Sequence, residues 1–347
     1  MKAKLGIAPI AWSNDDLPEL GGETSLDTCL SESKLAGFTG VETGGKFPKT
    51  PEKLGPILKS HKLYLASGWY SGTVLDNDLE NEKDRVLQQL TLFRDLGAAV
   101  LAYGETSGTI QNVRHAPLNT KRKIHSEDFK EYGRKLTLFA EFCADFGVPI
   151  SFHHHMGTAI ETEQELDSLM NHTGEAVKIL FDTGHMTFAG GDSLGVINKH
   201  AKRINHFHAK DIRSKIVDNL DRSKQSFLDF VLEGAFTVPG DGNINFKEVV
   251  ETLSKNNYEG WFIVEAEQDP AKANPFEYAK IGNKELVECL GMYGYQIEAR
   301  SGGTTGPVFL HFFWKGFRTR ACKDIICILA QKRFFCNVKN VCACLRL

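Results

Sequence analysis

Short apolar runs alternate with amphipathic stretches along most of the chain. The apolar runs have the length and composition of strands, and they occupy residues 4–11, 38–42, 63–67, 99–103, 148–153, 177–182, 204–208 and 261–265. A stretch with helical spacing of its apolar residues follows each run. Strands that are joined by helical crossovers must be parallel, and eight such units close naturally into a barrel. The pattern therefore predicts an α/β fold, a single (β/α)8 TIM barrel.

Two of the helical stretches are especially clear. In residues 82–96 the apolar side chains share one face, and Gly97 ends the stretch. The second stretch has Ser126 as its predicted N-cap and ends before Gly147. A doubly wound open sheet is the competing fold, but no GxGxxG motif follows the first strand to support dinucleotide binding.

The charge of the chain is unevenly distributed. The 347 residues carry a net charge of −3, but residues 301–347 contain eight Lys or Arg and one acid, so that the first 300 residues carry −10. A body this acidic does not present the basic face that nucleic acid binding requires. We expect no nucleic-acid partner. We also expect no membrane span in residues 1–300, because no apolar run there approaches ~18 residues.

The cysteines follow the same uneven distribution. Cys29, Cys143 and Cys289 are scattered, as is typical of reduced thiols rather than of a disulfide framework. The chain also begins without a signal-peptide pattern, so these features predict a cytoplasmic location. The other five of the eight cysteines lie in a basic, aromatic tail after a Gly-rich linker at 301–306. We expect residues 301–347 to be a poorly ordered appendage that the barrel of residues 1–300 does not require.

Histidines and acids stand where the predicted strands end. In chain order they are Glu42, Glu105, His153, His154, His155, Asp182, His208 and Glu265. The active sites of TIM barrels lie at the rim where the strands end. Nitrogen and oxygen donors without cysteine suit Mn²⁺, Co²⁺ or catalytic Zn²⁺ better than Ca²⁺ or a structural zinc. We therefore predict a divalent metal site made of His153 or His155 with Asp182, His208 and Glu265.

Further polar residues accompany these candidates. His185 lies just beyond the end of the sixth strand, where it can bind substrate or orient a ligand. The period of two along a strand places His206, His208 and Lys210 on one face, so that Lys210 can reach the mouth of the barrel. His206 either faces the mouth as well or packs deeper in the barrel, whereas His154 points away from its two neighbours.

Two loops at the mouth are each open to two interpretations. Residues 211–243 form either a lid or an insertion packed on the barrel wall, and we favour the lid. Asn14, Asp15 and Asp16 either contact a hydroxyl-rich ring or are ordinary solvated loop residues.

Several segments carry a resemblance to a known family. They are HHHMGT at 153–158, DTGH at 182–185, HFHAKD at 206–211 and VPGDG at 238–242, with the segments 6–23, 36–48 and 261–270. They resemble the xylose-isomerase-like TIM barrels and, within these, the inosose dehydratases (2-keto-myo-inositol dehydratases) of inositol catabolism. The resemblance covers about residues 1–300, and the tail does not match it.

The resemblance implies a set of metal ligands. In the wider superfamily these are a glutamate, an aspartate, a histidine and a glutamate that end the fifth to eighth strands, and the last three correspond to Asp182, His208 and Glu265. The fifth strand departs from the pattern because it ends in histidines. His153 is then the expected ligand and His155 faces the substrate, although the two can exchange roles.

The resemblance also implies an activity. The family uses Mn²⁺ or Co²⁺ to dehydrate a small polyol ketone, 2-keto-myo-inositol (scyllo-inosose), to a trihydroxycyclohexane-1,2-dione. Glutathione is linked to this activity by the resemblance alone, since nothing in the sequence shows a glutathione site. A homo-oligomer is compatible with the sequence.

Such a dehydration needs two proton-transfer groups. A metal on the ketone acidifies the neighbouring C–H, a base removes the proton, and the departing hydroxide needs an acid. Base candidates are Glu42, Glu265 and Glu267, and candidates for the acid or for substrate orientation are His155, His185 and Lys210.

Other functions compete with dehydration. A sugar isomerase or 3-epimerase would use the same metal chemistry but would reprotonate the enediolate. An apurinic endonuclease is disfavoured by the charge of −10 on residues 1–300. A polyol-binding protein without activity would not need converging proton donors and metal ligands.

Overall fold

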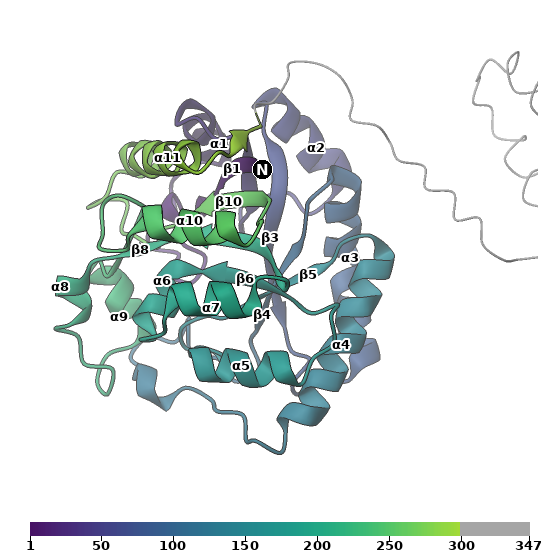
Figure 1. The fold of residues 1–347 in the computed structure, drawn as a ribbon. Helices are drawn as coiled ribbons and strands as arrows, with labels where there is room; N and C mark the ends of the chain where they lie inside the picture. The colour runs from purple at the N-terminus through teal and green to yellow at the C-terminus, as the bar shows by residue number, and fades with distance from the viewer. Residues whose placement is uncertain (299–347) are drawn as a thin grey trace, which may run out of the picture. The chain divides into compact units, whose positions relative to one another are not determined.

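The computed structural model describes residues 1–298, so the tail predicted at 301–347 lies outside the described residues. Within residues 1–298, eight parallel strands form a closed barrel with helices around it (Figure 1). The barrel strands are β1 (Lys2–Ile7), β2 (Gly40–Thr43), β3 (Tyr64–Gly72), β4 (Leu101–Glu105), β5 (Ile150–His153), β6 (Lys178–Asp182), β7 (Ile204–Ala209) and β10 (Gly260–Val264). The predicted TIM barrel is confirmed.

The ring closes between its first and last strands. β1 pairs in parallel with β2 on one side and with β10 on the other. Trp261 of β10 packs against Gly40 of β2, where a Cβ atom would lie 2.3 Å from the indole ring. β11 (Gln296–Ile297) pairs with the start of β1. Because the eight strands run the same way, their carboxyl ends meet at one rim.

Helices cover the outside of the barrel. They are α1 (Leu26–Leu35), α2 (Pro51–Ser60), α3 (Leu79–Leu96), α4 (Phe129–Phe146), α5 (Glu163–Asn171), α6 (Thr183–Phe188), α7 (Ser193–His200), α10 (Phe246–Lys255) and α11 (Pro275–Met292). Their apolar faces and the outward side chains of the strands form one large core. Burial of this apolar surface is the main stabilising contribution to the fold.

The ends of the two helices predicted most clearly can be compared with the sequence pattern. Gly97 and Gly147 end α3 and α4 in the left-handed conformation, with φ of 74° and 103°, as predicted. The predicted N-cap Ser126 is wrong, because α4 begins at Phe129 after Asp128. The Ser126 hydroxyl bonds to the Glu127 side chain instead of to a helix N–H group.

An insertion follows β7. It contains β8 (Asp211–Ile212), α8 (Ser214–Val217), α9 (Phe227–Leu232) and β9 (Phe236–Thr237), and β8 pairs antiparallel with β9. The Ser226 side chain caps α9 and exchanges hydrogen bonds with Asp229. The apolar side chains of α9 belong to a second core that also includes Met156 and Phe188. The insertion is therefore a packed unit at the rim of the barrel.

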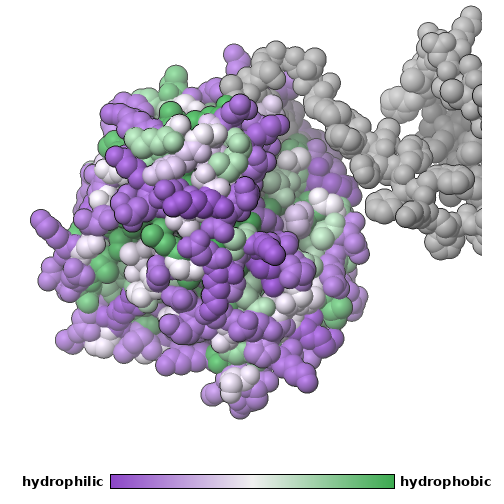
Figure 2. All heavy atoms as spheres, viewed as in Figure 1, coloured by the Kyte–Doolittle hydropathy of each residue, from purple (hydrophilic) through white to green (hydrophobic). Residues whose placement is uncertain are grey.

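The structure can be compared with the predictions of reduced thiols and of no membrane span in residues 1–300. Hydrophilic side chains dominate the visible face of the described residues (Figure 2). Cys29, Cys143 and Cys289 are buried and free. Among residues 1–298, no helix has the length and apolar character needed to cross a membrane.

Candidate active site

The ends of four neighbouring strands bring the predicted ligands together. Asp182 at the end of β6 is in register with His208 of β7, and His208 is in register with Ile263 of β10. His153 ends β5, and Glu265 comes directly after β10. The side chains of His153, Asp182, His208 and Glu265 are buried, and one ligand atom of each lies within 4.8 Å of the others. We call these four residues the metal cluster.

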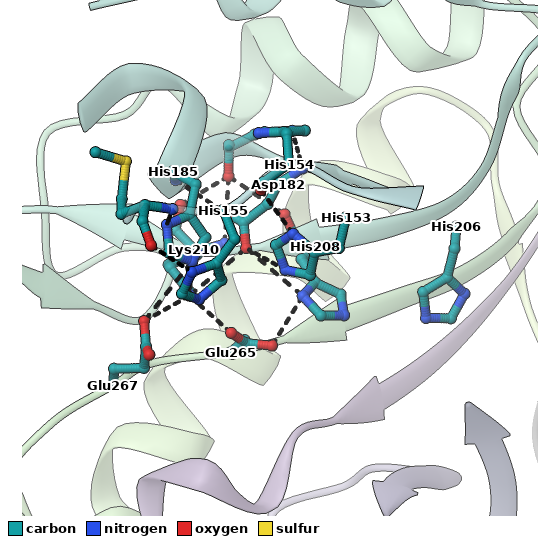
Figure 3. A network of polar contacts seen from close by, with 12 residues as sticks. His153, His154, His155, Asp182, His185, His206, His208, Lys210, Glu265 and Glu267 are labelled. Atoms are coloured by element: carbon teal, nitrogen blue, oxygen red, sulfur yellow. Dashed lines mark hydrogen bonds and ion pairs between the residues drawn. The ribbon is translucent and has the colours of Figure 1, made fainter. Parts of the chain in front are cut away.

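The metal cluster fits a divalent cation. His208 Nδ1 lies 2.8 Å from Glu265 Oε2 and 3.5 Å from Asp182 Oδ2, and His153 Nε2 lies 3.8 Å from the same Asp182 oxygen (Figure 3). Asp182 Oδ1 caps α6 by accepting from the His185 N–H at 2.8 Å, which turns Oδ2 toward the other groups. Among the described residues, Asp182 Oδ2 has no donor within hydrogen-bond distance, and His208 Nδ1 and Lys210 Nζ lie 3.5 and 3.7 Å from it. A buried oxygen normally has a partner, so this oxygen beside the nitrogens of His153 and His208 suits a cation.

The geometry distinguishes His153 from His155. The Nδ1 atom of His153 lies 2.7 Å from the His154 carbonyl, and that of His155 lies 2.8 Å from the Met156 carbonyl. A carbonyl only accepts, so both Nδ1 atoms carry the hydrogen and both Nε2 atoms have a free lone pair. The Nε2 atom of His153 belongs to the metal cluster, whereas His155 groups with His185 and Glu267. The position of its Nε2 atom favours His153 over His155 as the predicted metal ligand.

Lys210 connects the metal cluster to the second group. Its ammonium Nζ lies 2.7 Å from Glu265 Oε1, 2.9 Å from Glu267 Oε2 and 2.8 Å from His185 Nε2 (Figure 3). The stem of Lys210 passes over Gly184, where a Cβ atom would lie 2.5 Å from Lys210 Cγ. The side chain is completely buried. Burial opposes its charge, but the three carboxylates of Asp182, Glu265 and Glu267 outweigh burial and raise the pKa of Lys210.

The environment sets different protonation states for the other groups. Burial and the charge of Glu265 raise the pKa of Glu267 to about 7, although Lys210 acts in the opposite direction. Burial and the charge of Lys210 lower the pKa of His155 to about 4. Burial and the neighbouring His155 lower the pKa of His185 well below its usual value. Near neutral pH, Glu267 can therefore exchange a proton while both histidines are neutral.

Glu42 lies beside the metal cluster rather than within it. Its Oε1 atom lies 2.9 Å from His206 Nε2 and 3.1 Å from His208 Nε2, and the Ser67 hydroxyl donates to the same oxygen. His206 is fully buried, contacts Glu42 and is not among the residues that line the cavity, so the structure favours the deeper of the two positions considered from the sequence. His154 points the other way, as the alternation predicts, and its Nε2 accepts from the Asp182 N–H.

A cavity of about 110 Å³ opens over these groups. Its lining includes Asp15, Asp16, Glu42, Trp69, Gln111, His153, His155, His208, Glu265 and Glu267. Asp15 and Asp16 therefore face the site, whereas Asn14 caps the loop by accepting from the Asp16 and Leu17 N–H groups. Glu105 is buried at the end of β4 and accepts from Leu75, Tyr103 and Ser107.

Sequence reasoning missed Trp69 and Gln111. The predicted third strand stops at Ser67, but β3 continues to Gly72 and so carries Trp69 to the rim. The Trp69 ring meets those of His153 and His155 edge-on, with centroids 5.7 and 5.6 Å away. The apolar and polar residues continue to alternate beyond Ser67, and this pattern could have indicated that the strand extends to Trp69.

The insertion after β7 packs behind two histidines of the site. The Phe227 ring of α9 lies 5.1 Å from the His155 ring, and the Phe236 ring of β9 lies 5.5 Å from that of His185. These apolar rings shield the polar groups from water. The structure shows α9 packed into the second core, and no residue of 211–243 is among those that line the cavity, which favours the packed insertion over the lid.

Comparisons with known proteins agree with this architecture. Residues 30–285 match the family described as xylose isomerase-like TIM barrel. The rhizopine catabolism protein MocC of Rhizobium meliloti is 46% identical over 300 residues, which cover 86% of this chain and 92% of that protein. An inosose dehydratase of Geobacillus thermodenitrificans is 43% identical over 293 residues, which cover 84% of this chain and 98% of that protein.

Solved structures share the fold at low sequence identity. The IOLI protein with a bound zinc atom has a TM-score of 0.62 and 16% identity, and the match covers 84% of this chain and 99% of that chain. The probable 3-DHS dehydratase AsbF of Bacillus anthracis has a TM-score of 0.61 and 16% identity, and the match covers 82% of this chain and 98% of that chain.

The fold and the matched residues define a xylose isomerase-like TIM barrel protein. Within this class, the chain belongs to the family of the inosose dehydratases, which it matches over nearly their whole length.

Proposed function

We propose that this protein is a metal-dependent hydro-lyase that dehydrates 2-keto-myo-inositol (scyllo-inosose) to a trihydroxycyclohexane-1,2-dione. One observation carries the proposal: the buried metal cluster adjoins Glu267, a cavity-lining carboxyl whose pKa is raised to about 7. A cation site beside a proton-transfer group is what removal of an acidic C–H proton requires. The inosose dehydratase names of the relatives give the substrate class.

The metal cluster of His153, Asp182, His208 and Glu265 would hold the cation. Two imidazole nitrogens and two carboxylates suit Mn²⁺ or Co²⁺, which we propose as the physiological metals. A bound divalent cation supplies polarisation of the ketone and stabilises the negative charge that develops on the substrate oxygens.

Glu267 is the base we favour for the C–H proton. It lines the cavity, and a pKa near the working pH is the best compromise between availability and strength for a general base. Lys210 fixes its position through the contact of 2.9 Å between Nζ and Oε2. Glu265 lies against the same ammonium, and its pKa is held well below its usual value because Lys210 and His208 outweigh burial.

The departing hydroxide needs a proton. His155 lines the cavity, but its Nε2 is unprotonated near neutral pH, so it accepts a hydrogen bond from a substrate hydroxyl. Lys210 keeps its proton and contacts both His185 and Glu267. Because its pKa is raised, Lys210 is not the acid. We therefore propose that Glu267 returns the proton that it took from the C–H group to the departing hydroxide, while Lys210 holds the Glu267 carboxyl in position.

The remaining lining residues suit a hydroxylated ring. Trp69 presents an aromatic surface for the C–H face of the ring, and Asp16 and Gln111 offer hydrogen bonds to hydroxyl groups. Asp16 Oδ2 lies 3.3 Å from Gln111 Nε2, so the two side chains hold one another in place. Phe227 limits the access of water from the insertion side.

The test is product identification. The Mn²⁺-loaded protein is incubated with scyllo-inosose in D2O, and mass spectrometry and ultraviolet absorbance follow loss of one water and formation of the dione. A sugar isomerase or 3-epimerase would instead return an isomer of the substrate that carries deuterium, without loss of water. Asp182→Asn protein serves as the control for adventitious metal catalysis.

Three accompanying expectations belong with this proposal. We propose a cytoplasmic location, which the free thiols of Cys29, Cys143 and Cys289 support. A role for glutathione stays a prediction from the family resemblance, and assays with and without glutathione test it. Association into a homo-oligomer is a further prediction, and light scattering tests it.

A further inference from the structure

Glu42 touches His208 on the side that faces away from the metal cluster. The two ring nitrogens of His208 have different neighbours, since Nδ1 lies 2.8 Å from Glu265 Oε2 and Nε2 lies 3.1 Å from Glu42 Oε1. Nδ1 is also the atom that faces Asp182. Nδ1 is therefore the nitrogen that a cation in the metal cluster would contact, and Nε2 is left to Glu42.

Glu42 is itself held from two further directions. Its Oε1 atom receives the Ser67 hydroxyl hydrogen and lies 2.9 Å from His206 Nε2. Ser67 and His206 are fully buried, and Glu42 is nearly so. A carboxylate only accepts, so the hydrogen of the His208–Glu42 contact belongs to His208 Nε2.

We propose that Glu42 is a positioning residue that fixes the hydrogen of His208 on Nε2, so that Nδ1 offers its lone pair to a divalent cation. The inference rests on the proposed metal centre. Imidazole ligands commonly donate their second N–H to a carboxylate, which fixes the ring and strengthens the ligand. When the cation binds, Nδ1 gives up any proton it carries to solvent while Nε2–H remains.

This role replaces the one predicted from the sequence. The sequence predicts Glu42 as a base for the substrate because Glu42 stands at the end of the second predicted strand. Its Oε1 atom already meets three donors, from Ser67, His206 and His208. An oxygen engaged in this way is a poor proton acceptor for substrate, but it is well suited to orient a ligand.

Metal affinity gives the first test. The full chain is stripped with a chelator and titrated with Mn²⁺ by calorimetry, as wild type, Glu42→Ala and Glu42→Gln. We expect roughly 10–100-fold weaker binding in Glu42→Ala. Glu42→Gln keeps an acceptor oxygen without the charge, so we expect an intermediate affinity. The control Glu105→Gln changes another buried strand-end carboxyl with three donors and should bind as wild type.

The outcomes separate the two proposals. Wild type that binds no Mn²⁺ would refute the metal centre and hence the proposed function. If wild type binds Mn²⁺ and a folded Glu42→Ala variant binds it with equal affinity, only the role of Glu42 is refuted. Circular dichroism establishes that each variant is folded.

A second readout needs no variant of Glu42. Zn²⁺ is diamagnetic, so nitrogen NMR of the Zn²⁺-loaded wild type can distinguish the two ring nitrogens of His208, with a His208→Gln spectrum for assignment. We expect hydrogen on Nε2 and metal on Nδ1. Metal on Nε2 would overturn the proposal even if every Glu42 variant failed to fold.

Discussion

Lys210→Met tests the electrostatics of the site most severely, because it removes a buried ammonium and keeps a long unbranched side chain. Nζ lies 2.7 Å from Glu265 Oε1, 2.9 Å from Glu267 Oε2 and 3.7 Å from Asp182 Oδ2. At an effective dielectric constant of about 20, the 2.7 Å contact alone amounts to about 6 kcal/mol before desolvation is subtracted. Removal of one partner of a buried ion pair costs about 3–5 kcal/mol. We predict a loss of this size in the free energy of unfolding of the metal-free protein.

The loss should depend on pH. The pKa of Glu267 is already raised from 4.5 to about 7 in the folded protein, and it should rise further without Lys210. A carboxyl with a raised folded pKa binds more protons when folded than when unfolded, so its stability contribution falls as pH rises through that interval. The deficit of Lys210→Met relative to wild type should therefore be larger at pH 9 than at pH 6.

Urea unfolding in the presence of a chelator, at pH 6 and pH 9, measures both effects. The control Lys224→Met removes an ammonium that is 80% exposed and lies 3.0 Å from Asp221. Exposed pairs contribute about 0–1 kcal/mol, so we expect little change. A Lys210→Met protein as stable as wild type at both pH values would refute the view that Lys210 offsets the buried carboxylates.

Four other predictions follow from the site. Asp182→Asn and Glu265→Gln should each weaken Mn²⁺ binding in calorimetry by more than the roughly 10–100-fold typical of an outer partner, and activity should fall in parallel; wild-type affinity in both would mean that other carboxylates hold the metal. The kcat/KM of wild type should rise with pH as the Glu267 carboxylate base forms, and this limb should be absent from the residual activity of Glu267→Gln. Trp69→Ala should raise KM more than it lowers kcat in steady-state assays, and an unchanged KM would remove Trp69 from ring binding. Deletion of residues 301–347 should leave the circular dichroism spectrum and activity intact, because the family match ends at residue 285, and collapse of the truncated protein would contradict this.

The barrel could be predicted because its periodicity is local. Each parallel strand is covered by helices and so appears as a short apolar run, and each run is followed by a helix, as in residues 79–96 after β3. Asp182, His208 and Glu265 could be predicted for the same reason, since a polar residue that ends a buried run is placed at the rim by topology alone.

The contacts of the site could not be predicted, because they join residues far apart in the chain. Glu42 lies 164 positions from His206, and nothing in either segment indicates that they meet. The distinction between His153 and His155 depends on which carbonyl each Nδ1 reaches, a matter of side-chain rotation. Trp69 was missed because the end of β3 was placed too early.

The most direct test of the central claim is a titration of activity with metal. The chain is stripped with a chelator, Mn²⁺ or Co²⁺ is added back in steps, and dione formation from scyllo-inosose is measured together with bound metal. We predict no dehydration by the stripped protein and activity that rises in proportion to bound metal until the metal cluster is filled. Full dehydratase activity in the presence of chelator, with no metal retained, would contradict the account.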